Sequence, residues 1–248
     1  MNESELREQI CHIGRLLYQN NLIDSGSGNI SARLAPGRIL CTPSGLAKGF
    51  MRPEQLIIVN LDGERIDTPN EANADLGPTS ELPMHLECYR QREDVQGVVH
   101  AHPPNAVALT LTGHGFSECV IPEAIVLLGA IPVTPYATPS GTENRDAVSQ
   151  LVREHDAIML AYHGSLTVAD NLWEAYLLLE TLEHTAKILA TARSIGPIVP
   201  LPAHQVSKLF ALRKKLGKYR QGDEARFEAA WGPGVTSGEV MNAVAGGS

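Results

Sequence analysis

The order in which helix-type and strand-type patterns follow one another most restricts how this chain can fold. Residues 5–21 carry apolar side chains at three- and four-residue steps, which is the spacing of an amphipathic helix. Two pairs of short β-type runs come next, residues 29–34 with 38–42 and residues 56–60 with 64–67, each joined by a turn-forming dipeptide. We therefore expect a helix and two hairpins near the N-terminus, and not the strict strand–helix–strand repeat of a parallel sheet.

Helix-type and strand-type patterns also mix in the rest of the chain. Helices are expected directly after Pro103-Pro104 and at residues 81–91, 143–155, 172–193 and 204–219. Strands are expected at residues 95–102, 131–136 and 157–163. Neither a repeat nor a linker divides the chain, so we expect one α/β domain over residues 1–231. Residues 232–248 are rich in glycine and small side chains, and we expect this tail to be loosely ordered.

Composition argues against several classes of partner. The chain of 248 residues has 20 Lys and Arg against 28 Asp and Glu, so it offers no basic face for nucleic acid or anionic lipid. Its longest apolar stretch, residues 124–133, is much shorter than the roughly 20 residues that span a bilayer. The acidic start lacks the features of a signal peptide, and the scattered Cys11, Cys41, Cys88 and Cys119 form no CxxC pair. We expect a soluble, cytoplasmic protein with reduced cysteines.

A pair of histidines ends the strand expected at residues 95–102. Residues i and i+2 of a strand point to the same face, so His100 and His102 can reach one ion at the roughly 2.0–2.1 Å of zinc–nitrogen bonds. His163, beside Gly164 at the end of another strand, is a candidate third ligand. The alternative for His100 and His102 is a solvated loop. The remaining histidines of helical segments are expected to be structural: His12, His85, His155, His184 and His204.

Glu81 has two interpretations. It follows two hydroxyl residues at the start of an expected helix, where a carboxylate is favoured by the helix dipole. A carboxylate near a three-histidine site could also act as a fourth metal ligand without substrate and as a proton acceptor with substrate.

Three short stretches have the composition of an anion-binding turn. They are residues 28–31, residues 42–45 and the pair Thr79-Ser80, which combine hydroxyl or amide side chains with turn-forming residues. Backbone N–H groups in such turns can converge on an oxyanion, although each stretch alone also fits an ordinary turn. The chain lacks the GxxxxGK[ST] loop, so nucleotide hydrolysis is not indicated.

Taken in order, the motifs GNIS, TPSG, TSE, HAHP and HG resemble the class II aldolase/adducin family, and particularly its L-fuculose-1-phosphate aldolases. The resemblance covers roughly residues 6–219. It implies a single-domain, three-layer α/β/α fold with a central, largely antiparallel sheet. It also implies a homotetramer with active sites at the subunit interfaces.

The resemblance assigns site residues one by one. His100, His102 and His163 match the ligands of a divalent metal, with zinc expected, and Glu81 matches the ligand that also serves as catalytic acid/base. Five residues match positions around the substrate phosphate: Asn29, Ser44, Gly45, Thr79 and Ser80. The chain departs from the family at Gly26, where a threonine is common, and at residues 121–124, which lack the catalytic tyrosine that a neighbouring subunit donates. Tyr219 is the candidate for a second, C-terminal tyrosine.

The activity that the resemblance implies is that of a metal-dependent aldolase. Such an enzyme cleaves a ketose phosphate, here of the L-fuculose-1-phosphate kind, to dihydroxyacetone phosphate and an aldehyde through an enediolate. A decarboxylase of a β-keto (phospho)acid is the main alternative, because it needs the same electron sink and no tyrosine. A pentulose-phosphate 4-epimerase ranks third. A non-catalytic adducin-like domain is the remaining alternative, and loss of the metal ligands would mark it.

Overall fold

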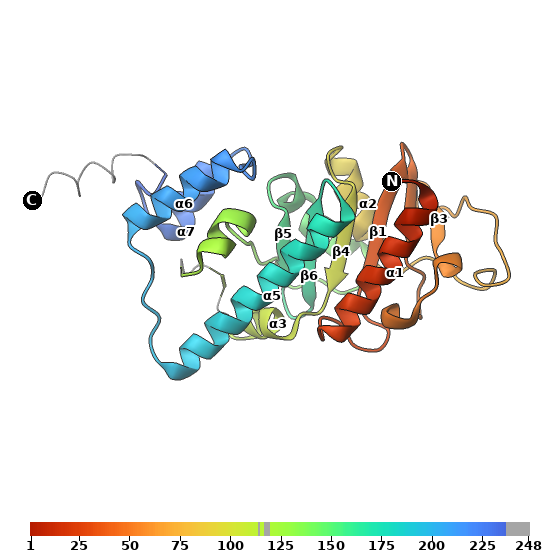
Figure 1. The fold of residues 1–248 in the computed structure, drawn as a ribbon, viewed down its shortest axis with the longest axis horizontal. Coiled ribbons are helices and arrows are strands. Elements are labelled where there is room, and N and C mark those ends of the chain that lie inside the picture. The colour runs from red at the N-terminus through yellow and green to blue at the C-terminus, as the bar shows by residue number, and fades with distance from the viewer. Residues whose placement is uncertain (114, 117–119, 237–248) are drawn as a thin grey trace, which may run out of the picture.

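A six-stranded antiparallel sheet forms the centre of the computed structural model, which describes residues 1–113, 115–116 and 120–236 (Figure 1). The strands lie in the order β3-β2-β1-β4-β6-β5. Their bounds are β1 Asn29–Ala35, β2 Arg38–Cys41, β3 Ile57–Val59, β4 Gly97–Ala101, β5 Ala157–Leu160 and β6 Gly164–Ala169. Antiparallel neighbours pair throughout, so β1 and β6, which flank β4, both run against it.

Helices cover both faces of the sheet. One apolar core joins one sheet face to α1 Glu3–Gln19, α3 Pro104–Leu111 and α5 Leu172–Ile195. A second core joins the opposite face to α2 Leu82–Gln91 and α4 Thr142–Ser149. Adjacent strand residues divide between these cores, as Val98 and Val99 of β4 do. The expected three-layer α/β/α architecture is therefore confirmed.

A third, smaller core lies beside the sheet, at the end of the molecule where Figure 1 shows α6 Ala203–Lys215 and α7 Asp223–Trp231. Phe210 and Phe227 pack there against Ile125 of a π-helical turn, Ala124–Leu128. Val235 is buried in the same cluster, and residues 237–248 lie outside the described residues. The domain boundary expected at residue 231 stays a prediction.

Most expected elements form, with differences that have physical causes. The hairpin of β1 and β2 is confirmed, whereas the arm expected at residues 64–67 contributes only one bridge, between Arg65 and Val59. The strand expected at residues 131–136 is wrong: Val133 makes a single bridge to Met159, in a segment interrupted by Pro132 and Pro135. β6 and α7 form in addition to the expected elements.

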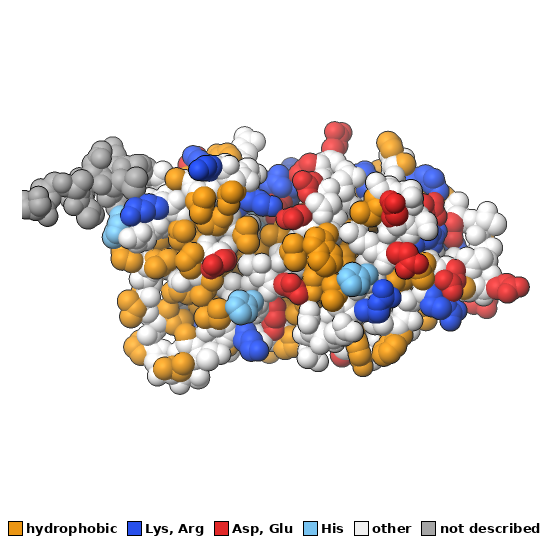
Figure 2. Space-filling model, in the orientation of Figure 1, with side chains coloured by type: hydrophobic (Ala, Val, Ile, Leu, Met, Phe, Trp, Pro, Cys, Tyr) orange, Lys and Arg blue, Asp and Glu red, His pale blue; other side chains and the backbone are white. Residues whose placement is uncertain are grey.

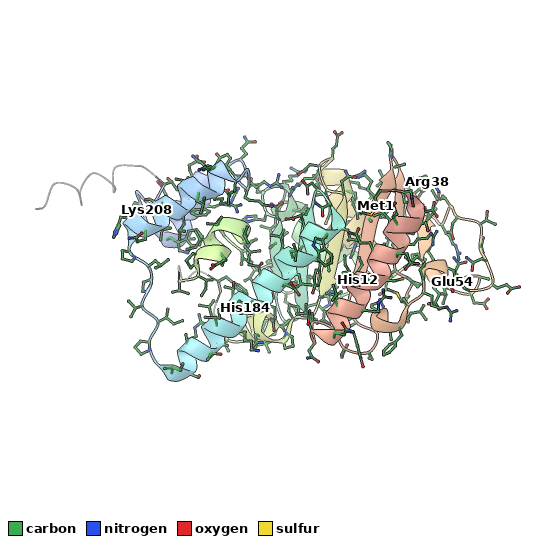
Figure 3. The ribbon with its side chains drawn as sticks, viewed as in Figure 1. Met1, His12, Arg38, Glu54, His184 and Lys208 are labelled. Atoms are coloured by element: carbon green, nitrogen blue, oxygen red, sulfur yellow. The ribbon has the colours of Figure 1, made fainter. Side chains whose placement is uncertain are left out.

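The surface carries both acidic and basic side chains (Figure 2), as the charge composition of the sequence leads us to expect. Figure 2 shows acidic and basic side chains interspersed on the face that carries α1 and α5, and Figure 3 shows His12 and His184 on those helices. Cys11, Cys41 and Cys88 are buried free thiols, and Cys119 lies outside the described residues. Within the described part of the chain, no helix has both the length and the apolar character needed to cross a membrane.

Candidate metal centre

Three histidines that are far apart in sequence meet at one end of the sheet. His100 lies on β4, His102 follows that strand, and His163 occupies the tight connection between β5 and β6. Because β4 pairs with β6, with Ala101 opposite Ser165, the two segments bring their imidazoles together. The ring centroids of the three histidines lie 4.8–4.9 Å apart.

The glycine after His163 makes this close approach possible. A β-carbon on Gly164 would lie 2.4 Å from the carbonyl oxygen of Ala101, 2.8 Å from His102 Cδ2 and 2.9 Å from His100 Cε1. No real side chain fits these distances without displacing the histidines. The HG motif therefore has a steric reason, which is to leave room for the other two rings.

The connection before His163 holds an uncommon backbone conformation. Tyr162 has a φ of 61°, in the left-handed region that bulky residues rarely adopt. Its N–H donates to Thr110 Oγ1 at 3.1 Å, and its ring meets Tyr136 edge-on at 6.3 Å between centroids. Contacts from outside the cluster therefore help to place the third histidine.

The carboxylate of Glu81 completes the cluster. One ligand atom from each of Glu81, His100, His102 and His163 lies within 4.8 Å of every other, so the four could hold one metal ion. His100 Nε2 is 2.9 Å from Glu81 Oε2 and 3.1 Å from His102 Nε2, and His163 Nε2 is 3.6 Å from Glu81 Oε1. Neighbouring ligand atoms of tetrahedral zinc lie about 3.3 Å apart, given bonds of roughly 2.0–2.1 Å. The spacing of the four side chains fits such an ion.

The protonation states of the three histidines also suit a bound cation. His100 Nδ1 donates to the carbonyl oxygen of Ser165 at 2.8 Å, so in the neutral ring Nε2 is the unprotonated nitrogen and faces the cluster. Burial is the main cause that lowers the pKa of His102 and His163 to about 4, so both are neutral at pH 7. Lone pairs that converge on one point repel each other unless a positive charge lies between them.

Glu81 is the N-cap residue of α2, yet its side chain makes no capping hydrogen bond. Its carboxylate instead accepts from Asn29 Nδ2 at 3.1 Å and from Asn144 Nδ2 at 3.3 Å. Burial by itself raises the pKa of Glu81, but positive charge in the histidine cluster and the Asn29 hydrogen bond lower it overall. The carboxylate is ionised and directed into the cluster, which favours the chemical interpretation over that of a simple helix-start residue.

A buried chain of hydrogen bonds extends from Glu81 beneath the sheet. Asn29 Oδ1 lies 2.6 Å from His85 Nε2, His85 Nδ1 lies 2.7 Å from Ser31 Oγ, and Ser31 Oγ lies 2.9 Å from Tyr89 OH. An amide oxygen only accepts, so His85 Nε2 carries the proton and Nδ1 accepts from the serine. The tyrosine then donates to the serine. Every hydrogen bond in this series has one donor and one acceptor. The series therefore fixes the orientation of the Asn29 amide, which in turn holds Glu81.

A cavity of about 380 Å³ opens beside the metal cluster. It is lined by Glu81, His102 and His163 and by all five residues expected around the phosphate: Asn29, Ser44, Gly45, Thr79 and Ser80. Backbone bonds between the segments hold them together, from Ser44 N to Gly77 O and from Thr79 N to Thr42 O. The Asn29 amide already contacts Glu81 and His85, which leaves one of its N–H groups for a ligand.

Several residues of this site were not identified from the sequence. Asn144 contacts Glu81 from α4, and Lys48 and Ser140 line the cavity, with Ser140 Oγ donating to Ser80 Oγ at 3.0 Å. His85 was assigned a structural role, and its helical pattern does contain one signal. It lies four residues after Glu81 and four before Tyr89, so the three share one face of α2.

Tyrosines are absent from the lining of this cavity as far as the chain is described. Tyr219 donates to Glu224 and packs against Phe210 in the C-terminal core. Tyr136 and Tyr162 are exposed beside the connection that carries His163. Within one chain, the described residues thus place no phenol in the cavity to protonate an aldehyde oxygen.

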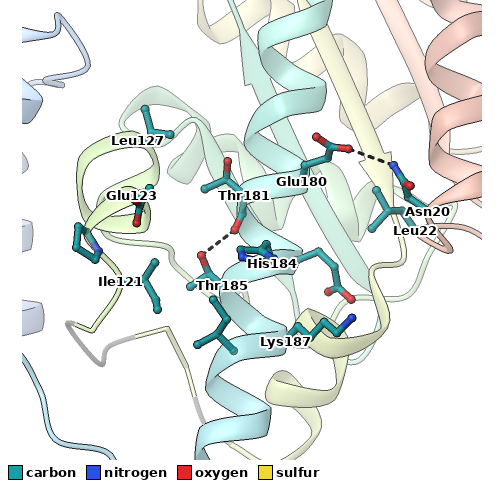
Figure 4. Close-up of a pocket in the computed structure, with 13 residues that line it drawn as sticks. Asn20, Leu22, Ile121, Glu123, Leu127, Glu180, Thr181, His184, Thr185 and Lys187 are labelled. Carbon is teal, nitrogen blue, oxygen red and sulfur yellow. Dashed lines mark hydrogen bonds between the residues drawn. The ribbon is translucent and has the colours of Figure 1, made fainter.

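A larger cavity, about 810 Å³, lies elsewhere, between α5 and residues 121–127 (Figure 4). Two of its acidic side chains have internal partners: Glu180 accepts from Asn20 at 3.1 Å, and Glu183 accepts from the N–H groups of Asn105 and Ala106 at the start of α3. These glutamates are therefore explained by packing and capping. The smaller cavity is the one that borders the Glu81 and histidine cluster.

Comparisons with known proteins agree with this geometry. A family model described as Class II Aldolase and Adducin N-terminal domain matches residues 8–190. A 5-deoxy-D-ribulose 1-phosphate aldolase of Bacillus thuringiensis is 33% identical over 217 residues, covering 87% of this chain and 97% of the relative. A 3-oxo-tetronate 4-phosphate decarboxylase of Escherichia coli is 30% identical over 211 residues, covering 84% and 96%. The crystal structure of YgbL from Klebsiella pneumoniae, described as an aldolase, epimerase or decarboxylase, matches with a TM-score of 0.76 at 30% identity, covering 84% and 99%.

Replacing His85 with glutamine should make the free energy of unfolding less dependent on pH in acid. Burial lowers the pKa of His85 to about 3 in the folded protein, against 6.5 for an ordinary histidine. Between these values the unfolded chain holds the extra proton, so the free energy of unfolding falls as the pH falls, by at most about 1.4 kcal/mol per pH unit for this residue. Urea unfolding across this pH range, with chelator present, should give a smaller slope against pH for His85→Gln than for the parent.

His12 provides the matched control, because it is exposed on α1 and stacks on Trp173. The His12→Gln variant should keep the slope of the parent. Equal slopes for the parent and His85→Gln would contradict a buried, neutral imidazole at residue 85.

Proposed function

The chain belongs to the class II aldolase and adducin family, and from that premise we propose that it is a metal-dependent carbon–carbon lyase. The proposed reaction cleaves a ketose phosphate, of the L-fuculose-1-phosphate kind, to dihydroxyacetone phosphate and an aldehyde. The observation that carries the proposal is the ionised Glu81 carboxylate, 2.9 Å from His100 Nε2, at the wall of a cavity with hydroxyl side chains. The complete donor set argues against a non-catalytic role.

Zinc is the proposed ion, held by His100, His102 and His163 and by Glu81 when no substrate is bound. The bound ion would supply Lewis acidity that favours negative charge on the substrate oxygens.

Glu81 is the proposed acid/base. Its carboxylate is ionised and held by two asparagine amides, so it can accept a proton from the carbon next to the substrate carbonyl and later return it. The buried hydrogen-bond chain through His85 keeps Asn29, and hence the carboxylate, in one orientation. This chain's own contribution is a base held in one orientation.

The phosphate of the substrate is proposed to bind Ser44, Gly45, Thr79 and Ser80, with the free N–H of the Asn29 amide. These groups line the same cavity as Glu81, so one extended substrate can reach both. Neutral hydroxyl and backbone donors satisfy phosphate oxygens without disturbing the ionised carboxylate nearby.

A decarboxylase is the second candidate, and the lack of a tyrosine in the described lining of the cavity favours it. Loss of carbon dioxide from a β-keto acid leaves the same carbanion as aldol cleavage and produces no aldehyde oxygen to protonate. The 30% identical relative from Escherichia coli has a decarboxylase name and a phosphorylated substrate. Both candidates use Glu81 and the donor set in the same way.

A homotetramer is the proposed assembly, and its mass should be measurable in solution. Tyr136 and Tyr162 are 63% and 61% exposed beside the His163 connection and meet edge-on, and in the proposed assembly a neighbouring subunit would cover them. Sedimentation equilibrium at micromolar concentration should give a mass close to four times 26.7 kDa. A fully active monomer would contradict the proposed assembly.

Metal content should depend on each of the three histidines. The purified parent should carry about one zinc ion per chain, because the four donors suit a single tetrahedral ion. Elemental analysis of His100→Ala, His102→Ala and His163→Ala should show most of that metal lost, whereas His184→Ala, on the exposed face of α5, should keep it. Metal content equal to that of the parent in all three variants would show that the proposed ligands are wrong.

Replacing Glu81 with glutamine should slow proton transfer strongly and leave the fold in place. The side chain makes no capping bond, so α2 should persist, but an amide cannot accept the proton. The rate at which the parent exchanges the carbon-bound proton of dihydroxyacetone phosphate, followed by NMR in heavy water, should fall roughly 10²–10⁴-fold.

Glu87→Gln is the control, because Glu87 lies on the same helix, is similarly buried and bonds to Ser149 outside the cavity. It should exchange at the parent rate. Unchanged exchange by metal-loaded Glu81→Gln would rule out Glu81 as the base. If the parent exchanges nothing but releases carbon dioxide from a phosphorylated β-keto acid, the decarboxylase is the correct activity.

A further inference from the structure

A buried lysine lies in the wall of the cavity that holds Glu81 and His163. Lys48 begins the short helix η1, Lys48–Phe50, and is only 2% exposed. Its Nζ donates to the carbonyl oxygen of Gly26 at 3.0 Å and to that of Leu46 at 2.6 Å. The ammonium group therefore joins the two loops that enclose this side of the cavity.

Two glycines fix the backbone from which Lys48 extends. A β-carbon on Gly14, inside α1, would lie 2.4 Å from the carbonyl oxygen of Lys48, and one on Gly49 would lie 2.7 Å from Tyr18 Cβ. Glycine inside a helix is unfavourable, so its presence at residue 14 needs a reason. That reason is the close packing of η1 on α1, which leaves the lysine side chain directed at the cavity.

Lys48 has no carboxylate partner among the described residues. Its two hydrogen bonds go to neutral carbonyls and leave one N–H and the positive charge unmatched. Burial lowers the pKa of Lys48 to about 8, so the charged form still predominates at pH 7. A buried cation without an anion is unfavourable, and an anion in the cavity would remove that penalty.

We propose that Lys48 binds the anionic group of the substrate and makes the site selective for a phosphate monoester over an uncharged analogue. Ser44, Thr79 and Ser80 line the same cavity and supply hydroxyl groups, and Lys48 supplies the charge that they lack. Lys48 is thus a specificity-determining residue. The inference rests on the proposed function for the identity of the substrate, but the anion-binding property is measurable separately.

Two variants distinguish charge from loop attachment. Lys48→Gln keeps N–H donors for the two carbonyls and loses the charge, and Lys48→Met loses both. Lys208→Met, at an exposed position on α6, removes one positive charge outside the site. Calorimetric titration of each purified protein with inorganic phosphate is the first measurement, and thermal unfolding without phosphate checks that each variant is folded.

Lys48→Gln and Lys48→Met should each weaken phosphate binding about 10- to 100-fold, as expected for loss of one charge-assisted hydrogen bond. Lys208→Met should bind as the parent does. A parent that binds no phosphate, or a Lys48→Gln variant that binds it within twofold of the parent, overturns the proposal and reduces Lys48 to a loop contact.

The second measurement compares proton exchange on dihydroxyacetone phosphate with exchange on dihydroxyacetone. The parent should prefer the phosphorylated compound, and Lys48→Gln should lose most of that preference through a higher KM, with kcat changed less than threefold. An unchanged preference overturns the proposal. If the parent exchanges neither compound, the proposed lyase function fails, while the phosphate titration still decides the role of Lys48.

Discussion

The pairing of β4 with β6 is the interaction on which the site depends. It places His100 opposite Leu166 and Ala101 opposite Ser165, and so joins two segments more than sixty residues apart. The same register lets the carbonyl oxygen of Ser165 accept from His100 Nδ1 and so direct Nε2 towards the cluster. One antiparallel ladder therefore fixes where His100 and His163 lie and which nitrogen His100 presents, and a shift by one residue would turn the side chains to the other face.

The two faces of β1 next to this ladder have different surroundings. Ile30 packs in the core with α1, α3 and α5, while Asn29 and Ser31 point to the opposite face, where α2 lies. The polar chain from Tyr89 to Glu81 runs through an otherwise apolar layer, and each of its groups has a partner. Satisfied polar groups in a low-dielectric layer stiffen it, because a change in any one of them leaves another unpaired.

Local patterns predict much of this fold and its cluster, and tertiary contacts explain the remainder. The spacing of His100 and His102 identifies a shared face without any structure, and the turn at Pro36-Gly37 identifies the first hairpin. His163 could be named as a candidate, but its closeness to the pair depends on the β4–β6 register. Asn144 and Lys48 carry no local signal, because their roles arise from burial beside segments distant in sequence. The failed strand at residues 131–136 shows prolines outweighing an apolar run.

The left-handed backbone of Tyr162 limits which substitutions the residues around it can tolerate. A left-handed backbone is unfavourable for an aromatic residue, so the local preference of the chain opposes the turn that carries His163. The turn persists because Thr110 and Thr134 accept its N–H groups and Tyr136 meets the tyrosine ring. These three residues are not among those that line the cavity beside the cluster. Substitutions at their positions should nevertheless be poorly tolerated, because they hold the turn that places His163.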